Sequence, residues 1–193
     1  MTKTVYNFSA GPSVLPKKAT QEAAQAIMDF AGTGIGILEM SHRTKPIENM
    51  VADTESMLRE LMGIPENYDI VFLGGGASLQ FCMVPMNLLD EKAHADYTDT
   101  GVWAAKAIKE AKRFGTVNVV SSSKADVYNH IPKDFQQTEG ATYLHVTSNN
   151  TIYGTKYSYI PDTGDIPLVA DMASCIISEP VDVTKFGVIY AGA

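Results

Sequence analysis

Apolar residues in the first third of the chain recur at helical spacing. One amphipathic helix is predicted to begin at Pro16 and to end before Gly32, because proline suits a first helical turn and glycine suits the position just past the end. Its apolar face is expected to hold Ala19, Ala23, Ala26, Ile27 and Phe30. A second stretch keeps the same period from Pro46 to a cap at Gly63. The pattern therefore predicts two helices at the start of the chain.

Short apolar runs dominate the rest of the chain, and their length is typical of buried parallel strands. They are YDIVFL (68–73), TVNVV (116–120), TYLHV (142–146), PLVAD (167–171) and GVIYA (187–191). A helical stretch from Val102 to Phe114, stopped by Gly115, lies between the first two runs. This alternation predicts an α/β domain with a largely parallel sheet, whose ligands bind beyond the carboxyl ends of the strands.

The run at 68–73 leads directly into Gly74-Gly75-Gly76-Ala77-Ser78, and a helical stretch containing Pro85 follows. Glycines let the backbone come close to a bound group, and the unpaired N–H groups of a new helix attract an anion. A plain tight turn is the alternative for a bare glycine triplet. The Gly-Lys-Ser/Thr of a P-loop is missing, and the dinucleotide fingerprint fails at Leu79. A single phosphate monoester is therefore favoured over ATP or NAD.

Composition narrows the class of protein further. The 193 residues are 45% hydrophobic and 19% charged, as in an ordinary globular domain. The net charge of -7 argues against a general nucleic-acid binder. The amino terminus lacks the apolar stretch of a signal peptide, and no run reaches membrane-spanning length. We expect a cytoplasmic protein that contacts neither nucleic acid nor membrane and holds no metal.

Seven motifs, in the same order, resemble the phosphoserine aminotransferase family. They are SAGPSVLP (9–16), MSHRTKP (40–46), GGGASLQF (74–81), TGVW (100–103), SNNTIYGT (148–155), VADMAS (169–174) and YAGA (190–193). The resemblance spans the chain and implies a class-V, fold-type-I enzyme that uses pyridoxal 5'-phosphate (PLP). Its large domain has a mostly parallel, seven-stranded type of sheet, which would be incomplete in this chain. The family is homodimeric and moves amino groups between phosphoserine, glutamate and their keto acids in serine and pyridoxine biosynthesis.

The resemblance also assigns the parts of the chain. Residues 1–15 would form an arm of the small-domain and active-site region, and residues 16–193 the amino-terminal part of the PLP-binding large domain. The Schiff-base lysine of the family is expected just after Ala193, so no catalytic residue is expected within residues 1–193, which alone should be inactive. Lys185 cannot replace it, because the strand that follows would leave it about 20 Å from the ligand edge. Lys124, Lys133 and Lys156 lie in polar connections.

Five residues match the family's cofactor contacts. Ala77 and Ser78 correspond to the phosphate contacts, in agreement with the cradle predicted from the glycines. Trp103 corresponds to the aromatic that stacks on the pyridine ring, a role that suits an indole. Thr151 corresponds to the hydroxyl at the phenolic oxygen, and Asp171 to the carboxylate at the ring nitrogen. Without the resemblance, these last three would be interpreted as a core aromatic, a polar loop residue and a helix cap.

His42 and Arg43 match the family's pair that holds the anionic end of the substrate. An Arg fork and a His donor suit a phosphate or carboxylate, although such a cationic cluster is usually a solvated loop. Two alternatives stay open. One is another class-V aminotransferase, such as an alanine–glyoxylate type. The other is a non-catalytic α/β module that binds a phosphorylated metabolite and would need neither Trp103, Thr151 nor Asp171.

Overall fold

The computed structural model describes residues 5–9 and 13–192. These fall into two compact units, which divide between Met57 and Leu58. Residues 1–4 and 10–12 of the predicted arm lie outside the described part, as does Ala193, the last residue before the expected lysine. Each unit is taken by itself below.

The first unit contains helix α1 (Lys17–Met28), the short 3-10 helix η1 (Ile37–Glu39) and most of helix α2 (Lys45–Met62). Both predicted helices are confirmed, and Gly63 follows α2 with a positive φ of 63°. The expected apolar face of α1 is only partly correct. Phe30 lies beyond the end of the helix, and no residue of α1 is buried. The spacing therefore predicted the helix but not a contact that covers it.

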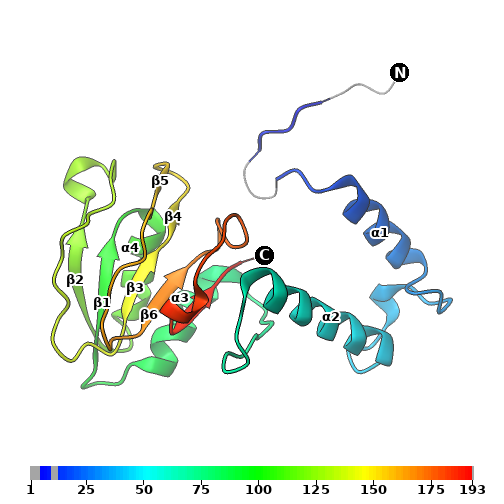
Figure 1. Cartoon of the computed structure of the whole chain (residues 1–193), viewed down its shortest axis with the longest axis horizontal. Coiled ribbons are helices and arrows are strands. Elements are labelled where there is room, and N and C mark those ends of the chain that lie inside the picture. Colours follow the sequence, from blue (N-terminus) through cyan, green and yellow to red (C-terminus); the bar gives the residue numbers. More distant parts are fainter. Residues whose placement is uncertain (1–4, 10–12, 193) are drawn as a thin grey trace. The chain divides into compact units, whose positions relative to one another are not determined.

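The second unit is built on a five-stranded sheet in the order β2-β1-β3-β6-β7, and every neighbouring pair is parallel (Figure 1). The strands are β1 (His94–Asp99), β2 (Thr116–Ser122), β3 (Leu144–Thr147), β6 (Leu168–Asp171) and β7 (Val188–Tyr190). A small antiparallel hairpin joins β4 (Asn149–Asn150) to β5 (Thr155–Lys156). The predicted α/β class with a mostly parallel sheet is confirmed.

The two faces of the sheet are covered differently. Helices α3 (Gly76–Leu88) and α4 (Val102–Ala111) pack on one face, against a core that includes Tyr97, Tyr143 and Tyr190. The other face packs against connecting segments, which include Val181 and Phe186 on either side of the 3-10 helix η3 (Val183–Lys185). A further 3-10 helix, η2 (Lys124–Asp126), follows β2. The helical layer thus brings the start of α3 to the sheet.

One predicted strand is wrong, and one strand of the sheet was not predicted. YDIVFL (68–73) forms no strand, and Val71, Phe72 and Leu73 are 54–66% exposed. A strand needs a hydrogen-bonded neighbour, and this segment has no ladder partner among the described residues. It joins the unit instead through the Tyr68 hydroxyl, which donates to the Phe186 carbonyl at 2.8 Å. The opposite error is β1, which lies inside the sheet although its sequence HADYTD is too polar to suggest a buried strand.

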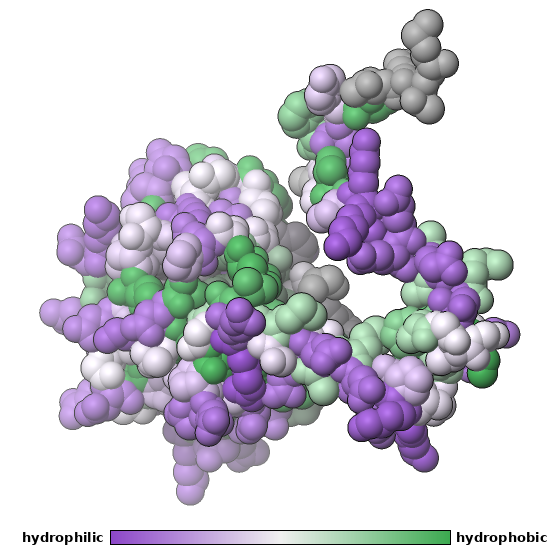
Figure 2. Space-filling model, turned by 45° about the vertical axis from the view of Figure 1, so that its right-hand side comes forward, coloured by the Kyte–Doolittle hydropathy of each residue, from purple (hydrophilic) through white to green (hydrophobic). Residues whose placement is uncertain are grey.

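Apolar side chains remain exposed in both units. The space-filling view shows them as green patches among purple, hydrophilic residues (Figure 2). In the first unit they include Val14, Leu15 and Leu38, each more than 60% exposed. In the second unit they include the segment from Val71 to Leu73. Apolar area of this kind is typical of surfaces that another element covers.

Candidate functional site

All five strands of the described sheet end at one edge. Because the strands are parallel, the carboxyl ends of β1, β2, β3, β6 and β7 point the same way. Asp171, the last residue of β6, pairs in register with Thr147 on β3 and Tyr190 on β7. Trp103 and Thr151 lie in the segments that follow β1 and β3, so they and Asp171 belong to the carboxyl ends of three strands.

The glycine run ends in a helix start, as predicted. Helix α3 begins at Gly76, so Ala77 and Ser78 lie in its first turn, and no side chain caps its amino end. Gly75 adopts a φ of 98°, in the region that favours glycine. The free N–H groups and the positive end of the helix dipole make this turn suited to an anion.

The end of β7 reaches this helix start. A Cβ placed on Gly192 would lie 3.1 Å from the Ala77 backbone nitrogen and 3.6 Å from the Ala77 Cβ. The close approach explains why glycine suits position 192, and it connects the cradle to the sheet edge. The sequence motif YAGA contained this glycine, but nothing in its spacing indicated the contact.

Trp103 and Thr151 are brought together from separate segments. Trp103 lies in the first turn of α4, and its Nε1–H donates to the Thr151 Oγ1 at 3.4 Å. The Trp103 ring is partly buried against the core beneath α3 and α4, and the Lys106 Nζ lies 4.1 Å from its centroid. An indole held in this way offers a fixed aromatic surface at the sheet edge. Its stacking on a cofactor ring stays a prediction.

Asn150 holds the Thr151 loop against the turn that leads into α4. Its side chain is buried and exchanges hydrogen bonds of 3.4 Å with the Thr100 hydroxyl. A Cβ at Gly101 would meet the Asn150 side-chain oxygen at 2.6 Å, so the two segments touch there. Asn150 was not identified from the sequence as a site residue. Its only signal was its place inside SNNTIYGT, one residue before Thr151.

Asp171 is a buried acid with little to stabilise its charge. Its side chain is 5% exposed, and its Oδ1 accepts a hydrogen bond from the Ala173 N–H at 3.0 Å. Burial raises the pKa of Asp171 above the ordinary range, and the Ala173 hydrogen bond opposes the rise only in part. The described residues provide no ion pair to this carboxyl. A cationic group on a ligand would therefore be a favourable partner.

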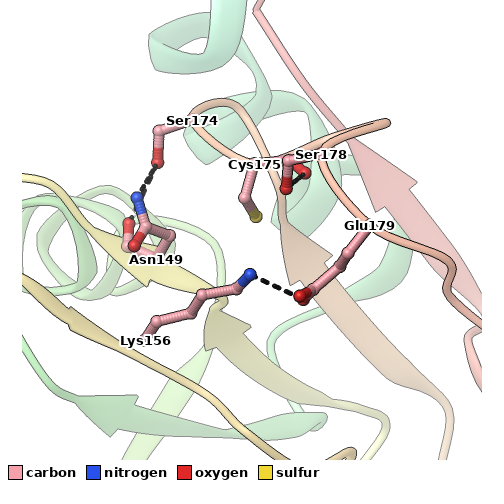
Figure 3. A network of polar contacts seen from close by, with 6 residues as sticks. All are labelled: Asn149, Lys156, Ser174, Cys175, Ser178 and Glu179. Atoms are coloured by element: carbon pink, nitrogen blue, oxygen red, sulfur yellow. Dashed lines mark hydrogen bonds and ion pairs between the residues drawn. The ribbon is translucent and has the colours of Figure 1, made fainter.

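A polar bridge joins the loop after β6 to the hairpin after β3. The Asn149 side-chain amide donates to the Ser174 hydroxyl at 2.9 Å, and that hydroxyl donates to the Asn149 carbonyl at 3.2 Å (Figure 3). In the same view the Lys156 Nζ points to the Glu179 carboxylate, 2.6 Å away. The bridge ties the segment that follows Asp171 to the segment that contains Thr151, so the two predicted contacts share one framework.

The four internal lysines considered as replacements do not lie in the segment that follows β7. Lys185 ends η3, before β7 begins, so it lies at the amino end of that strand, as predicted. Lys156 is engaged with Glu179 in the hairpin. Lys124 begins η2 just after the carboxyl end of β2, which is the edge strand farthest from β7. Lys133 lies in an irregular segment. None of the four lies in the segment that approaches Ala77.

The predicted substrate pair belongs to the first unit. His42 and Arg43 are both exposed in the turn before α2. The Arg43 N–H donates to the Ser41 hydroxyl at 3.3 Å, and the Thr44 N–H donates to the Ser41 carbonyl at 3.0 Å. Both side chains are therefore presented to solvent within their own unit, and their role toward a substrate stays a prediction.

Comparison with known proteins shows to which family the chain belongs. Residues 5–193 match the family described as aminotransferase class-V. The chain belongs to this family. It is 51% identical over 195 residues to the phosphoserine aminotransferase of Lysinibacillus sphaericus, and the match covers 100% of the chain and 54% of that protein. The chain thus spans about half the length of the curated relatives it matches.

Solved structures agree with the same assignment. Phosphoserine aminotransferase from Bacillus circulans subsp. alkalophilus is 45% identical, with a TM-score of 0.95, over 100% of this chain and 54% of its own. The PLP-bound phosphoserine aminotransferase from Trichomonas vaginalis is 34% identical, with a TM-score of 0.87, over 97% and 53%. The five-stranded sheet is therefore part of the fold found in these PLP enzymes.

The described residues offer neither a membrane-spanning helix nor a cluster of metal ligands. No helix in residues 5–9 and 13–192 is both long and apolar enough to cross a bilayer. No group of three or more His, Cys, Asp or Glu side chains in those ranges is arranged to hold a metal ion.

Proposed function

We propose that this chain is the amino-terminal half of a PLP-dependent phosphoserine aminotransferase. The observation that carries the proposal is the shared edge of the sheet. There the uncapped start of α3, the Trp103–Thr151 pair and the buried Asp171 come together, in a chain of the class-V family. A module that only binds phosphate would need the start of α3 but neither of the other two.

The residues present fit PLP. An anion-binding helix start suits its phosphate, and an acid whose pKa is raised by burial suits a cationic ring nitrogen. When bound, PLP supplies an electron sink for bonds at the substrate's α-carbon. In this proposal the N–H groups of Ala77 and Ser78 bind the phosphate, and Trp103 orients the ring. Thr151 donates to the phenolic oxygen, and the Asp171 carboxylate holds a proton at the ring nitrogen.

The substrates and surroundings follow from the same proposal. His42 and Arg43 would bind the phosphate of phosphoserine or the distal carboxylate of glutamate, because both offer charge-assisted donors. The lysine that binds PLP covalently and moves the substrate's α-proton would lie just after Ala193. The complete protein would work as a cytoplasmic homodimer in serine and pyridoxine biosynthesis.

A transamination assay on the full-length protein tests this function. Purified protein is supplied with L-phosphoserine and 2-oxoglutarate, and glutamate and 3-phosphohydroxypyruvate are measured. Alanine with glyoxylate serves as the competing substrate pair. We expect turnover of the first pair and little of the second. Turnover of alanine and glyoxylate alone would favour the other class-V activity. Phosphate binding without any PLP absorbance would favour the non-catalytic module.

A further inference from the structure

A layer of buried polar rings lies on the same face of the sheet as Asp171. His145 and Tyr190 are both buried, and the His145 Nε2 is 2.8 Å from the Tyr190 hydroxyl. Tyr97 stacks on His145 with ring centroids 4.6 Å apart, and its hydroxyl shares a hydrogen bond of 2.7 Å with the Tyr143 hydroxyl. The proposed function uses none of these four side chains.

The strand register places this layer under the candidate ring-nitrogen contact. Asp171 pairs with Tyr190, and Val169, two residues earlier on the same face, pairs with His145. Side chains two residues apart on a strand share a face of the sheet. The Tyr190 side chain therefore starts beside Asp171 and reaches across β6 to His145, which lies two strands away on β3 in register with Val169. The His145–Tyr190 hydrogen bond thus crosses beneath the Asp171 carboxyl.

Every member of the layer is neutral. Complete burial lowers the pKa of His145 to about 3, so its imidazole carries no charge near neutral pH. Burial also raises the pKa of Tyr190, and the negative charge of Asp171 raises it further, so this hydroxyl keeps its proton. The His145 Nδ1 is buried without a partner. An unpaired lone pair is tolerated better there than an unpaired N–H, so Nε2–H donates to the Tyr190 oxygen.

We propose that His145 and Tyr190 are positioning residues for Asp171. Their hydrogen bond fixes a neutral layer below the carboxyl, which keeps Asp171 facing the open edge and gives it no internal cation. The carboxylate then pairs with the cationic ring nitrogen of the ligand. This inference rests on the proposed function. Losing the Tyr190 hydroxyl leaves the His145 N–H buried and unsatisfied, and the imidazole then turns, or admits water or a proton, next to Asp171.

The test compares two Tyr→Phe variants of the full-length holoenzyme. Tyr190→Phe removes the hydroxyl that holds His145, and Tyr97→Phe is the matched control, because it also removes one buried hydroxyl hydrogen bond from the same core. The NMR resonance of the ring nitrogen in isotope-labelled PLP reports its protonation. PLP affinity and thermal stability are measured on the same samples.

We expect both variants to lose similar stability, but only Tyr190→Phe to shift the ring-nitrogen resonance toward the unprotonated value. Its PLP dissociation constant should rise about 5- to 20-fold. Equal resonances in the two variants would reduce the pair to a structural role and overturn the inference. If Tyr190→Phe does not fold, His145→Gln and His145→Leu replace it. The amide should keep the wild-type resonance and the leucine should not, and identical spectra would overturn the inference. If the wild-type full-length protein binds no PLP, the proposed function itself is wrong.

Discussion

Asp171 is the residue whose environment differs most from that of an ordinary surface acid. It is buried, one backbone N–H donates to it, and its pKa is raised. In ligand-free protein its charge therefore opposes folding. This loss of folding stability is absent at pH values below the ordinary pKa of 3.8, where the acid is protonated in both the folded and the unfolded protein. The loss grows as the pH rises from 3.8 to the raised pKa of the folded protein, and it is complete at higher pH.

Asp171→Asn should consequently stabilise the ligand-free protein near neutral pH, because the amide is uncharged and can still accept from the Ala173 N–H. The gain should shrink as pH falls toward 4 and disappear where the acid is protonated. Thermal melting of both proteins over this pH range, with PLP removed, measures the difference. A constant difference at every pH would show that the charge of Asp171 is not the cause.

Arg43 is the second single residue with a testable role, and this role is binding of the substrate. Arg43→Ala should raise the Michaelis constants for phosphoserine and glutamate roughly 10- to 100-fold, since one charge-assisted contact is lost. PLP binding should stay unchanged. Lys45→Ala is the control, because this neighbouring cation is turned to Glu48 at 3.8 Å within α2. If steady-state kinetics show the same constants for Arg43→Ala and wild type, Arg43 is not in the substrate site.

Helix α3 is the element whose start carries the phosphate assignment. Gly75 has a φ of 98°, and a Cβ there would run into the Leu79 side chain. Gly75→Ala should therefore destabilise the protein by about 1 kcal/mol or more and weaken PLP binding, since the turn must shift. Gly74→Ala is the matched control, because nothing lies within 4 Å of its Cβ. Denaturant unfolding and PLP titration should show a lower stability and a weaker PLP affinity for Gly75→Ala than for Gly74→Ala. Equal stability and equal PLP affinity of the two variants would contradict the assignment of the phosphate to the start of α3.

The elements show how far the sequence could predict the fold. Apolar runs predicted β3, β6 and β7, because a buried strand needs apolar side chains on both faces, and they also predicted the edge strand β2, in which no residue is fully buried. They missed β1, whose Asp96 is buried because it accepts from the Asn118 amide at 3.2 Å and the Thr138 N–H at 2.6 Å. Those partners are more than 20 residues away, so local spacing gave no sign of them. YDIVFL has a strand composition but lacks a ladder partner in the described chain.

The residues of the candidate site, like the strands, could be predicted from the sequence only in part. Glycines before a helix predicted the anion cradle from local chemistry alone. Trp103, Thr151 and Asp171 were identified through the family's motifs, and the structure joins the first two by a hydrogen bond. Asn150 and the His145–Tyr190 pair could not be identified from the sequence. Their importance comes from contacts across strands, and those contacts exist only after the sheet has formed.

At the scale of the whole molecule, this chain spans about half the length of the relatives it matches. We expect residues 1–193 alone neither to transaminate nor to bind PLP covalently, because no internal lysine lies in the segment that approaches Ala77. Borohydride reduction of residues 1–193 with PLP, followed by peptide mass mapping, checks the expectation. A phosphoserine aminotransferase that spans the full length of the relatives is the positive control. Stoichiometric label on Lys185, or on any other lysine of residues 1–193, would contradict it.

The central claim is that the Asp171 carboxylate holds a proton on the ring nitrogen of PLP in a phosphoserine aminotransferase. The most direct measurement is the turnover of full-length Asp171→Asn with phosphoserine and 2-oxoglutarate, beside its PLP content. An amide cannot keep the nitrogen protonated, so we expect PLP to stay bound while turnover falls about 100-fold or more. Near-normal turnover in this variant, with PLP bound, would contradict the claim.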